Sequence, residues 1–168
     1  ILNVTPDSFS DGGRFAGRDA ALRQAEAMAR DGAAIIDVGG ESTRPGAADV
    51  SEQEELDRVL PVIEAVVAAV DTAVSIDTSK PAVMRAAVGA GAAMINDIRA
   101  LREEGALRAA AELQCAVCLM HMQGQPRSMQ QEPAYGDVVA EVTEFLAQRV
   151  RACVAAGLAE ERIIVDPG

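Results

Sequence analysis

Residues 31–37 read Asp31-Gly-Ala-Ala-Ile-Ile-Asp37, and near copies recur as Ala90-Gly-Ala-Ala-Met-Ile-Asn96 and Ala156-Gly-Leu-Ala-Glu-Glu-Arg-Ile-Ile-Val-Asp166. Each copy follows a segment of helical period and has a Gly where a left-handed helix cap needs one. An apolar run comes next, and it ends on a carboxylate or an amide. The repeat therefore predicts a helix–Gly–strand unit that the chain uses several times.

The same alternation extends along the whole chain. Short apolar runs rich in β-branched residues predict strands over 1–5, 34–39, 74–78, 93–98, 116–121 and 162–166. Helical periodicity predicts helices over 19–31, 51–70, 81–90, 105–113 and 137–156. Ser51 and Glu54 have the spacing of a capping box at the start of the second helix.

This element order predicts an α/β fold with a parallel sheet covered by helices, because the strand runs are apolar on both faces. About six strands and five helices fit either an incomplete TIM (β/α)8 barrel or an open doubly wound sheet. No Pro- or Ser-rich linker divides the 168 residues, so we expect one domain over 1–168.

The composition excludes several classes of protein. A formal net charge of −11 argues against nucleic acid, which proteins bind through clustered Lys and Arg. No apolar run approaches the ~20 residues that cross a bilayer, and no signal-peptide pattern opens the chain. We therefore expect a cytoplasmic protein that binds neither nucleic acid nor a membrane. Cys115, Cys118 and Cys153 are expected to be buried free thiols, because a zinc site needs four ligands and His121 is the single histidine.

A polar side chain follows every predicted strand: Asn3, Asp37, Asp77, Asn96 with Asp97, His121 and Asp166. Asp and Asn favour turns, which would account for one such position but not for all of them. The pattern indicates a shared site at the carboxyl ends of the strands, where TIM barrels hold their active sites. Carboxylates and amides suit a ligand with N–H donors, such as an aminopyrimidine or a pterin ring. A metallohydrolase would usually carry more histidine ligands, so this class is less favoured.

Two predicted loops, 5–13 and 39–46, are crowded with Gly, Ser, Asp and Pro. Arg44 in the second loop is suited to bind a phosphate through two parallel hydrogen bonds. A surface ion pair with Glu41 is the alternative role for this arginine. Phe9 in the first loop is either a binding residue or a local packing residue.

These loops resemble the two signature segments of the dihydropteroate synthase family. The segments read Ile1-Leu-Asn-Val-Thr-Pro-Asp-Ser-Phe-Ser-Asp-Gly-Gly13 and Asp37-Val-Gly-Gly-Glu-Ser-Thr-Arg-Pro-Gly-Ala47. Ser75-Ile-Asp-Thr-Ser-Lys80, Ile95-Asn-Asp-Ile98, Cys118-Leu-Met-His-Met122 and Val165-Asp-Pro-Gly168 follow in the family's order. The resemblance implies a TIM barrel, a sulfonamide target and a transferase of folate biosynthesis. The implied enzyme condenses 6-hydroxymethyl-7,8-dihydropterin pyrophosphate with p-aminobenzoate, giving 7,8-dihydropteroate and pyrophosphate.

The resemblance also implies roles for individual residues. Asn3 would be the protein ligand of Mg²⁺, the implied cofactor. The implied pterin site consists of Asp77, Asn96 and Asp166, with Ile98 and Met120 flanking the ring. The implied sites for the other groups are Thr43 and Arg44 for pyrophosphate, Asp11 as the partner of Arg44 on loop closure, and Phe9 and Pro45 for p-aminobenzoate. Of these, the implied catalytic residues are Asp77, Asn96, Asp166, Arg44 and Asp11, and the complete protein is implied to be a homodimer.

Two alternatives stay open. One is a pterin-binding methyltransferase of the same superfamily, which shares the strand-end Asp and Asn residues; the other is a non-catalytic pterin-binding module. The family continues beyond the position of Gly168 with a strand-seven Lys and a strand-eight Arg-x-His, and this chain begins with Ile1 rather than Met. We therefore expect a barrel domain truncated at both ends. The isolated 168 residues are expected to fold poorly or to pair with another chain, and to lack synthase activity.

Overall fold

The computed structural model describes residues 1–4, 13–42, 49–124 and 133–168, and of residues 13–16 only the backbone. Its strands form one sheet in which β1 to β6 follow one another in chain order. Every neighbouring pair is parallel. The strands are β1 (Leu2–Asn3), β2 (Ile35–Gly39), β3 (Ala73–Asp77), β4 (Met94–Asp97), β5 (Ala116–Met120) and β6 (Ile163–Asp166).

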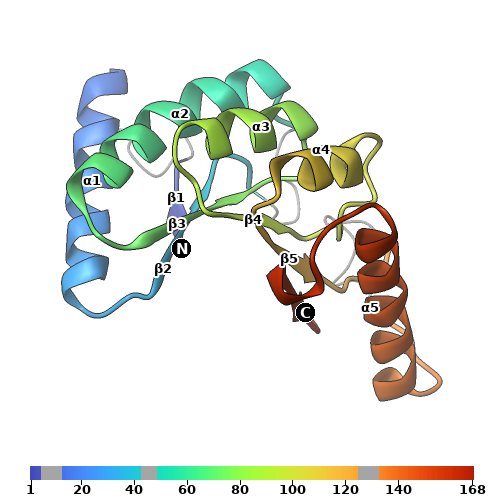
Figure 1. Ribbon diagram of the computed structural model, residues 1–168. Helices are drawn as coiled ribbons and strands as arrows, with labels where there is room; N and C mark the ends of the chain where they lie inside the picture. Colours follow the sequence, from blue (N-terminus) through green and yellow to red (C-terminus); the bar gives the residue numbers. More distant parts are fainter. Residues whose placement is uncertain (5–12, 43–48, 125–132) are drawn as a thin grey trace.

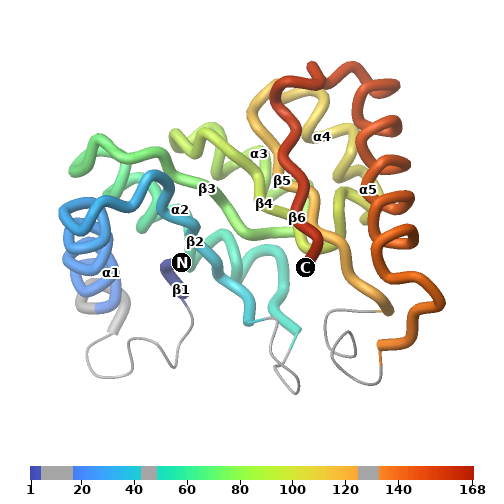
Figure 2. The backbone as a smooth tube through the Cα atoms, turned by 90° about the horizontal axis from the view of Figure 1, so that it is seen from below, coloured from blue at the N-terminus to red at the C-terminus, as the bar shows by residue number. Residues whose placement is uncertain are grey.

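A helix connects each strand to the next in the described chain. The helices are α1 (Gly13–Arg30), α2 (Glu52–Ala69), α3 (Pro81–Gly89), α4 (Ala106–Leu113) and α5 (Val138–Ala155), with a short 3₁₀ helix, η2 (Glu160–Arg162), before β6. Helices α1 to α4 follow one another over one face of the sheet, and α5 stands at the end of the row (Figure 1). Viewed at right angles, strands β2 to β6 fan out in chain order between α1 and α5 (Figure 2).

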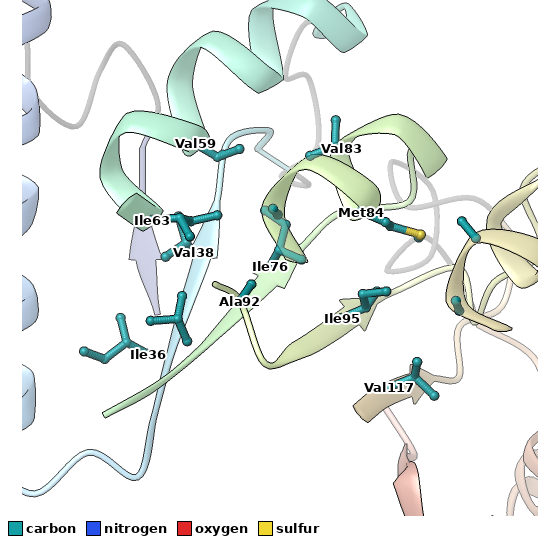
Figure 3. Packing of buried hydrophobic residues seen from close by; sticks show 14 of the residues in the cluster. Ile36, Val38, Val59, Ile63, Ile76, Val83, Met84, Ala92, Ile95 and Val117 are labelled. Atoms are coloured by element: carbon teal, nitrogen blue, oxygen red, sulfur yellow. The ribbon is translucent and has the colours of Figure 1, made fainter. Parts of the chain in front are cut away.

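The hydrophobic core lies between the helices and the sheet. Parallel partners in register point to the same face, and one such row consists of Leu2, Val38, Ile76, Ile95, Val117 and Ile163. All but the last of these are fully buried or nearly so. They pack against helix residues that include Val59 and Ile63 of α2 and Val83 and Met84 of α3 (Figure 3). This row therefore defines the helix-side face of the sheet.

The repeated helix–Gly–strand unit is confirmed, and each copy uses the same cap. Gly32, Gly91 and Gly157 have φ angles of +93°, +109° and +99°. In each copy the N–H of the following residue bonds to a carbonyl five positions back: Ala33 to Met28, Ala92 to Ala87, and Leu158 to Cys153. This is the Schellman arrangement, which ends the helix and turns the chain directly into the strand.

Other local predictions also hold, apart from two boundaries, one of which is that Ile1 and Val4 lie outside β1, expected over 1–5. Ser51 and Glu54 form the capping box of α2 through reciprocal hydrogen bonds. Helix α1 begins at Gly13 rather than near residue 19 and continues through Gly17. Glycine inside a helix costs about 1 kcal/mol relative to Ala, so the sequence pattern understates the first turns of this helix.

The α/β prediction is confirmed, with six parallel strands and helices in alternation. Within the described residues, the helices cover one face of the sheet, whereas a doubly wound sheet carries helices on both. The sequential strand order likewise matches part of a (β/α)8 barrel. In the described part of the chain, β1 pairs only with β2, and β6 pairs only with β5.

Substitution of the cap glycines gives the first testable prediction. Gly91→Ala and Gly157→Ala should each cost about 1–2 kcal/mol of unfolding free energy, because both residues have left-handed φ angles. Gly91→Ala should cost about 1 kcal/mol more, since a Cβ there would lie 2.9 Å from Val67 Cγ1, whereas Gly157 has nothing within 4 Å. Urea unfolding of the complete natural protein measures both values. Equal costs at the two positions would show that contact with Val67 contributes nothing.

Candidate functional site

The sheet face opposite the helices carries most of the predicted site residues. A second register row runs through Asn3, Gly39, Asp77, Asn96, Cys118 and Ile164, and Met120 pairs with Asp166. These residues alternate with the buried helix-side row, so they point to the other face, here called the inner face. Asn3, Asp77, Asn96, Met120 and Asp166 therefore share one face at the carboxyl ends of their strands, as the sequence predicts.

Gly39 separates Asn3 from Asp77 in this row. A Cβ on Gly39 would lie 3.4 Å from Asp77 Oδ2 and 3.7 Å from Asn3 Oδ1. The two side-chain oxygens therefore border the same small volume above the bare Cα of Gly39. A larger residue would occupy the space in which both oxygens can reach one ligand.

A hydrogen-bond network fixes the amide of Asn96. Its Nδ2 donates to Asp37 Oδ2 over 3.0 Å, and Ser75 Oγ donates to Asp37 Oδ1 over 2.5 Å. Ser75 is fully buried. One N–H of the Asn96 amide is committed to Asp37, which fixes the plane of the amide and orients its carbonyl oxygen and its second N–H for a ligand.

Asp77 has the most perturbed acidity of the site. Burial raises the pKa of Asp77 to about 7, and the negative charges of Asp37, Asp97, Glu55 and Glu41 add to the effect. The ionised form is therefore disfavoured until a positive charge or an N–H donor approaches. A strongly shifted carboxyl in a hollow is typical of a functional site.

The remaining pterin-site candidates lie on either side of these residues. Asp166 is exposed at the end of β6, and its carboxylate accepts a hydrogen bond from the Gly168 N–H over 2.9 Å. Burial raises the pKa of the Cys118 thiol, and the charges of Asp166 and Asp37 raise it further, so both carboxylates act on the same inner face. Ile98 lines a cavity of about 620 Å³ together with Asp77 and Lys80.

Asp97 and His121 do not join this group, which corrects the prediction of one site shared by all the strand-end residues. Asp97 is fully buried on the helix-side face, where it accepts bonds from Ser79 Oγ (2.5 Å) and from the N–H groups of Arg99 and Leu101 (2.9 Å each). It therefore holds the turn after β4. His121 lies beyond β5, and its ring contacts those of Phe145 (5.1 Å between centroids) and Tyr135 (5.9 Å).

Cysteine burial also differs in part from the prediction. All three cysteines are free, but only Cys153 is fully buried, while Cys115 and Cys118 are half-buried. The candidates Phe9, Asp11, Thr43, Arg44 and Pro45 lie outside the described residues, so their predicted roles stay predictions.

The structure brings two further residues to the candidate site for which the sequence predicts no role. Asp37 follows a predicted strand, and it is the acceptor that orients Asn96. Lys80 closes the Ser75–Lys80 motif without an assigned role, and its ammonium bonds both Glu41 and the buried Glu55. The only sequence signal for Lys80 was its place three residues after Asp77.

Comparison with known proteins agrees with this geometry. The sequence model of the family described as "Pterin binding enzyme" matches residues 1–168. Dihydropteroate synthase of Escherichia coli K12 is 55% identical over 168 residues, which is all of this chain and 60% of that protein. The Haemophilus influenzae enzyme is 56% identical, again over the whole chain and 61% of its own length.

Solved structures give the same result. The Yersinia pestis dihydropteroate synthase in complex with a sulfonamide drug superposes with a TM-score of 0.92 and 56% identity, covering all of this chain and 61% of that one. The Xanthomonas albilineans enzyme with 4-aminobenzoic acid gives a TM-score of 0.91 and 54% identity, covering 100% and 59%. This chain thus spans about three-fifths of the length of these relatives.

The full-length match of the family model and the high identity to dihydropteroate synthases lead to one assignment. The chain belongs to the pterin binding enzyme family, and the relatives compared above are all dihydropteroate synthases.

Proposed function

We propose that the complete protein carrying this chain is a dihydropteroate synthase. In this reaction the amine of p-aminobenzoate forms a C–N bond to the methylene carbon of 6-hydroxymethyl-7,8-dihydropterin pyrophosphate. The C–O bond to pyrophosphate breaks, and the amine loses a proton. The observation that carries the proposal is the single inner face shared by Asn3, Asp77, Asn96 and Asp166.

The inner-face residues are suited to hold a dihydropterin. Carboxylates of Asp77 and Asp166 accept N–H donors of the ring, and the oriented Asn96 carbonyl accepts another. Departure of pyrophosphate leaves positive charge spread over the dihydropterin. Asp77, whose ionised form is disfavoured by burial and by its neighbouring carboxylates, would then gain a favourable partner for its charge. Ile98 and Met120 would flank the ring.

The residues also fit the proposed magnesium ion. Within the part of the chain that the structure describes, no group of three or more His, Cys, Asp or Glu could hold a metal ion by itself. One amide oxygen, Asn3 Oδ1, next to Asp77 across Gly39, suits a cation that keeps waters and shares ligands with a substrate pyrophosphate. Mg²⁺ bound there would neutralise charge on the leaving pyrophosphate. Asn3 would hold the ion, while Thr43 and Arg44 would bind pyrophosphate oxygens.

The further roles rest on the family resemblance. Asp11 would pair with Arg44, and Phe9 and Pro45 would help enclose p-aminobenzoate. We also propose a homodimer and a cytoplasmic location, the latter supported by three free cysteines, which are typical of reducing compartments. Among the described helices, none is long and apolar enough to span a membrane.

Pyrophosphate release by the complete natural protein tests the proposal. We expect release to require the pterin pyrophosphate ester, p-aminobenzoate and Mg²⁺ together, because the amine is the nucleophile. A pterin-binding methyltransferase would release no pyrophosphate, and a binding module would bind the pterin in calorimetry without turnover. Pyrophosphate release that does not depend on p-aminobenzoate would refute the synthase assignment.

A further inference from the structure

The turn that follows β4 contains two strained residues. Ala100 and Leu101 have φ angles of +52° and +57°, and both are buried. A side chain is unfavourable at such angles, because its Cβ comes too close to the following carbonyl oxygen, and glycine normally occupies these positions. Strained residues of this kind persist only where the surrounding structure fixes them, and they are concentrated at ligand sites. Contacts with the rest of the chain must therefore hold this turn.

Asp97, the last residue of β4, holds the turn from the strand side. Its carboxylate accepts from the N–H groups of Arg99 and Leu101 over 2.9 Å each. Its backbone carbonyl accepts from the Ala100 N–H, also over 2.9 Å. Ile98 lies between Asp97 and Arg99 within this set of hydrogen bonds. The conformation of the turn therefore determines where the Ile98 side chain lies.

Arg149 of α5 holds the same turn from the helix side. Its Nε donates to the Ala100 carbonyl over 2.8 Å, and its Nη2 donates to the Leu101 carbonyl over 3.2 Å. The two acceptors are thus the carbonyls of the two strained residues. The guanidinium is planar and presents its donors in a fixed arrangement, so it can bind both carbonyls in one geometry only. Arg149 therefore fixes the two residues of the turn whose backbone angles are unfavourable.

Core packing is the simpler explanation for this turn, because Leu101 is buried and belongs to the hydrophobic core. Packing accounts for a large apolar side chain at position 101. It does not account for a half-buried guanidinium that donates to two neutral carbonyls and loses part of its hydration there. It also leaves the place of the turn unexplained, since Ile98 lines the cavity of about 620 Å³ together with Asp77. Strain at the wall of a candidate site is typical of a segment that positions a binding residue.

We propose that Arg149 is a positioning residue that, by holding the strained turn at Ala100 and Leu101, fixes Ile98 as one wall of the pterin site. This inference rests on the proposed function, in which Ile98 flanks the ring. Without the guanidinium, Ala100 would relax toward negative φ angles, and Ile98 would move with it because both belong to one turn. A glycine at position 100 adopts the left-handed angle without strain, so the turn would then need the guanidinium much less. The effect of Arg149 should therefore depend on the residue at position 100.

Arg149→Ala in the complete natural protein, with and without Ala100→Gly, tests this dependence. Calorimetry measures the Kd of 6-hydroxymethyl-7,8-dihydropterin pyrophosphate for each variant. We expect Arg149→Ala to raise this Kd about tenfold, since small displacements of positioning groups have effects of this size. Ala100→Gly alone should leave the Kd within about twofold of wild type, because the clamped turn keeps its shape. In the double variant Ala100→Gly should recover most of the lost affinity, a coupling that a double-mutant cycle measures.

Stability is the second readout, and Arg151→Ala is the matched control. Arg149→Ala should lower the urea midpoint by about 1 M. A purely structural role would also lower the midpoint, but the folded protein would bind the pterin ester with the Kd of wild type. Arg151 lies on the same helix but is exposed and pairs with Glu144 over 2.9 Å, so Arg151→Ala should leave the Kd within about twofold. If Arg149→Ala does not fold, Arg149→Lys, which keeps a donor for one carbonyl, should raise the Kd about threefold and show the same recovery.

The outcomes separate the inference from the proposed function. If wild type binds the pterin ester and Arg149→Ala leaves the Kd within about twofold, the positioning role alone is overturned. The role is also overturned if the Kd rises and Ala100→Gly does not lower it again, because the loss then does not arise in the strained turn. An equal rise in Arg151→Ala would attribute the effect to the charge of α5 and would overturn the role as well. If wild type does not bind the pterin ester, the proposed function and the inference both fail.

Discussion

Asp77→Asn is expected to make the protein more stable at pH 8 and to abolish most of its activity. The pKa of Asp77 in the folded protein is raised from 3.8 to about 7 by burial and by the neighbouring carboxylates, Asp37 first among them. Between about pH 4 and pH 7 the folded protein therefore binds one proton more than the unfolded chain, and its stability falls as the pH rises through this window. The neutral amide of Asn removes this loss.

The expected gain follows from the size of the shift. At pH 8 the gain is at most about 4 kcal/mol, the free-energy equivalent of moving one pKa from 3.8 to about 7. Near pH 4 the gain should vanish, because Asp77 is then protonated in the folded protein. Urea unfolding at the two pH values measures both. Asp71→Asn is the control: Asp71 is exposed, so the change should stay within about 0.5 kcal/mol at either pH.

Activity should move in the opposite direction. Under the proposed synthase function, charge that develops on the dihydropterin would lose the Asp77 carboxylate as a partner, and turnover should fall by about a thousandfold. Pterin affinity should fall by about 100-fold, the effect of losing a charge-assisted hydrogen bond. An equal stability gain at pH 4 and pH 8 would show that ionisation of Asp77 is not the cause. Unchanged pterin affinity would remove Asp77 from the site.

Much of the fold was predictable because its signals are local. The cap glycines, the capping box at Ser51 and the apolar strand runs each act over a few residues, and each appears where the sequence places it. The start of α1 was missed because Gly17 interrupts the helical pattern without ending the helix. Local composition therefore predicts the elements better than it predicts their ends.

The site was predicted less completely, because the face of the sheet to which a strand-end side chain points depends on the register of its strand. Asn96 and Asp97 are adjacent, so alternation sends one to the inner face and the other to the helices. Their apolar neighbours Met94 and Ile95 occupy the two faces in the same way, so the sequence did not distinguish them. Lys80 posed another difficulty, since its partners lie 25 and 39 residues away in sequence. These ion pairs can be recognised only in the folded structure, where the sheet and α2 bring the three side chains together.

Asn96→Asp is expected to be strongly destabilising, and to be so in a pH-dependent way. Asn96 donates to Asp37 Oδ2 over 3.0 Å, so the substitution would place two carboxylates in contact next to Asp77. One of them must keep a proton, which raises its pKa in the folded protein above the unfolded value. The stability that this proton provides is lost as pH rises, so we expect a loss of about 3 kcal/mol at pH 8 that largely disappears near pH 4.

A swapped pair, Asp37→Asn with Asn96→Asp, separates charge repulsion from ligand recognition. The amide at position 37 can donate to the new carboxylate at position 96 and still accept from Ser75 Oγ. Stability at pH 8 should therefore return to within about 1 kcal/mol of wild type, a coupling that a double-mutant cycle measures. Pterin affinity should return to within about tenfold of wild type, because one carboxylate oxygen at position 96 can still accept the N–H donor that the amide carbonyl accepts. A loss of affinity of about 100-fold that persists while stability recovers would mean that the second N–H of Asn96, and not its carbonyl, binds the ring.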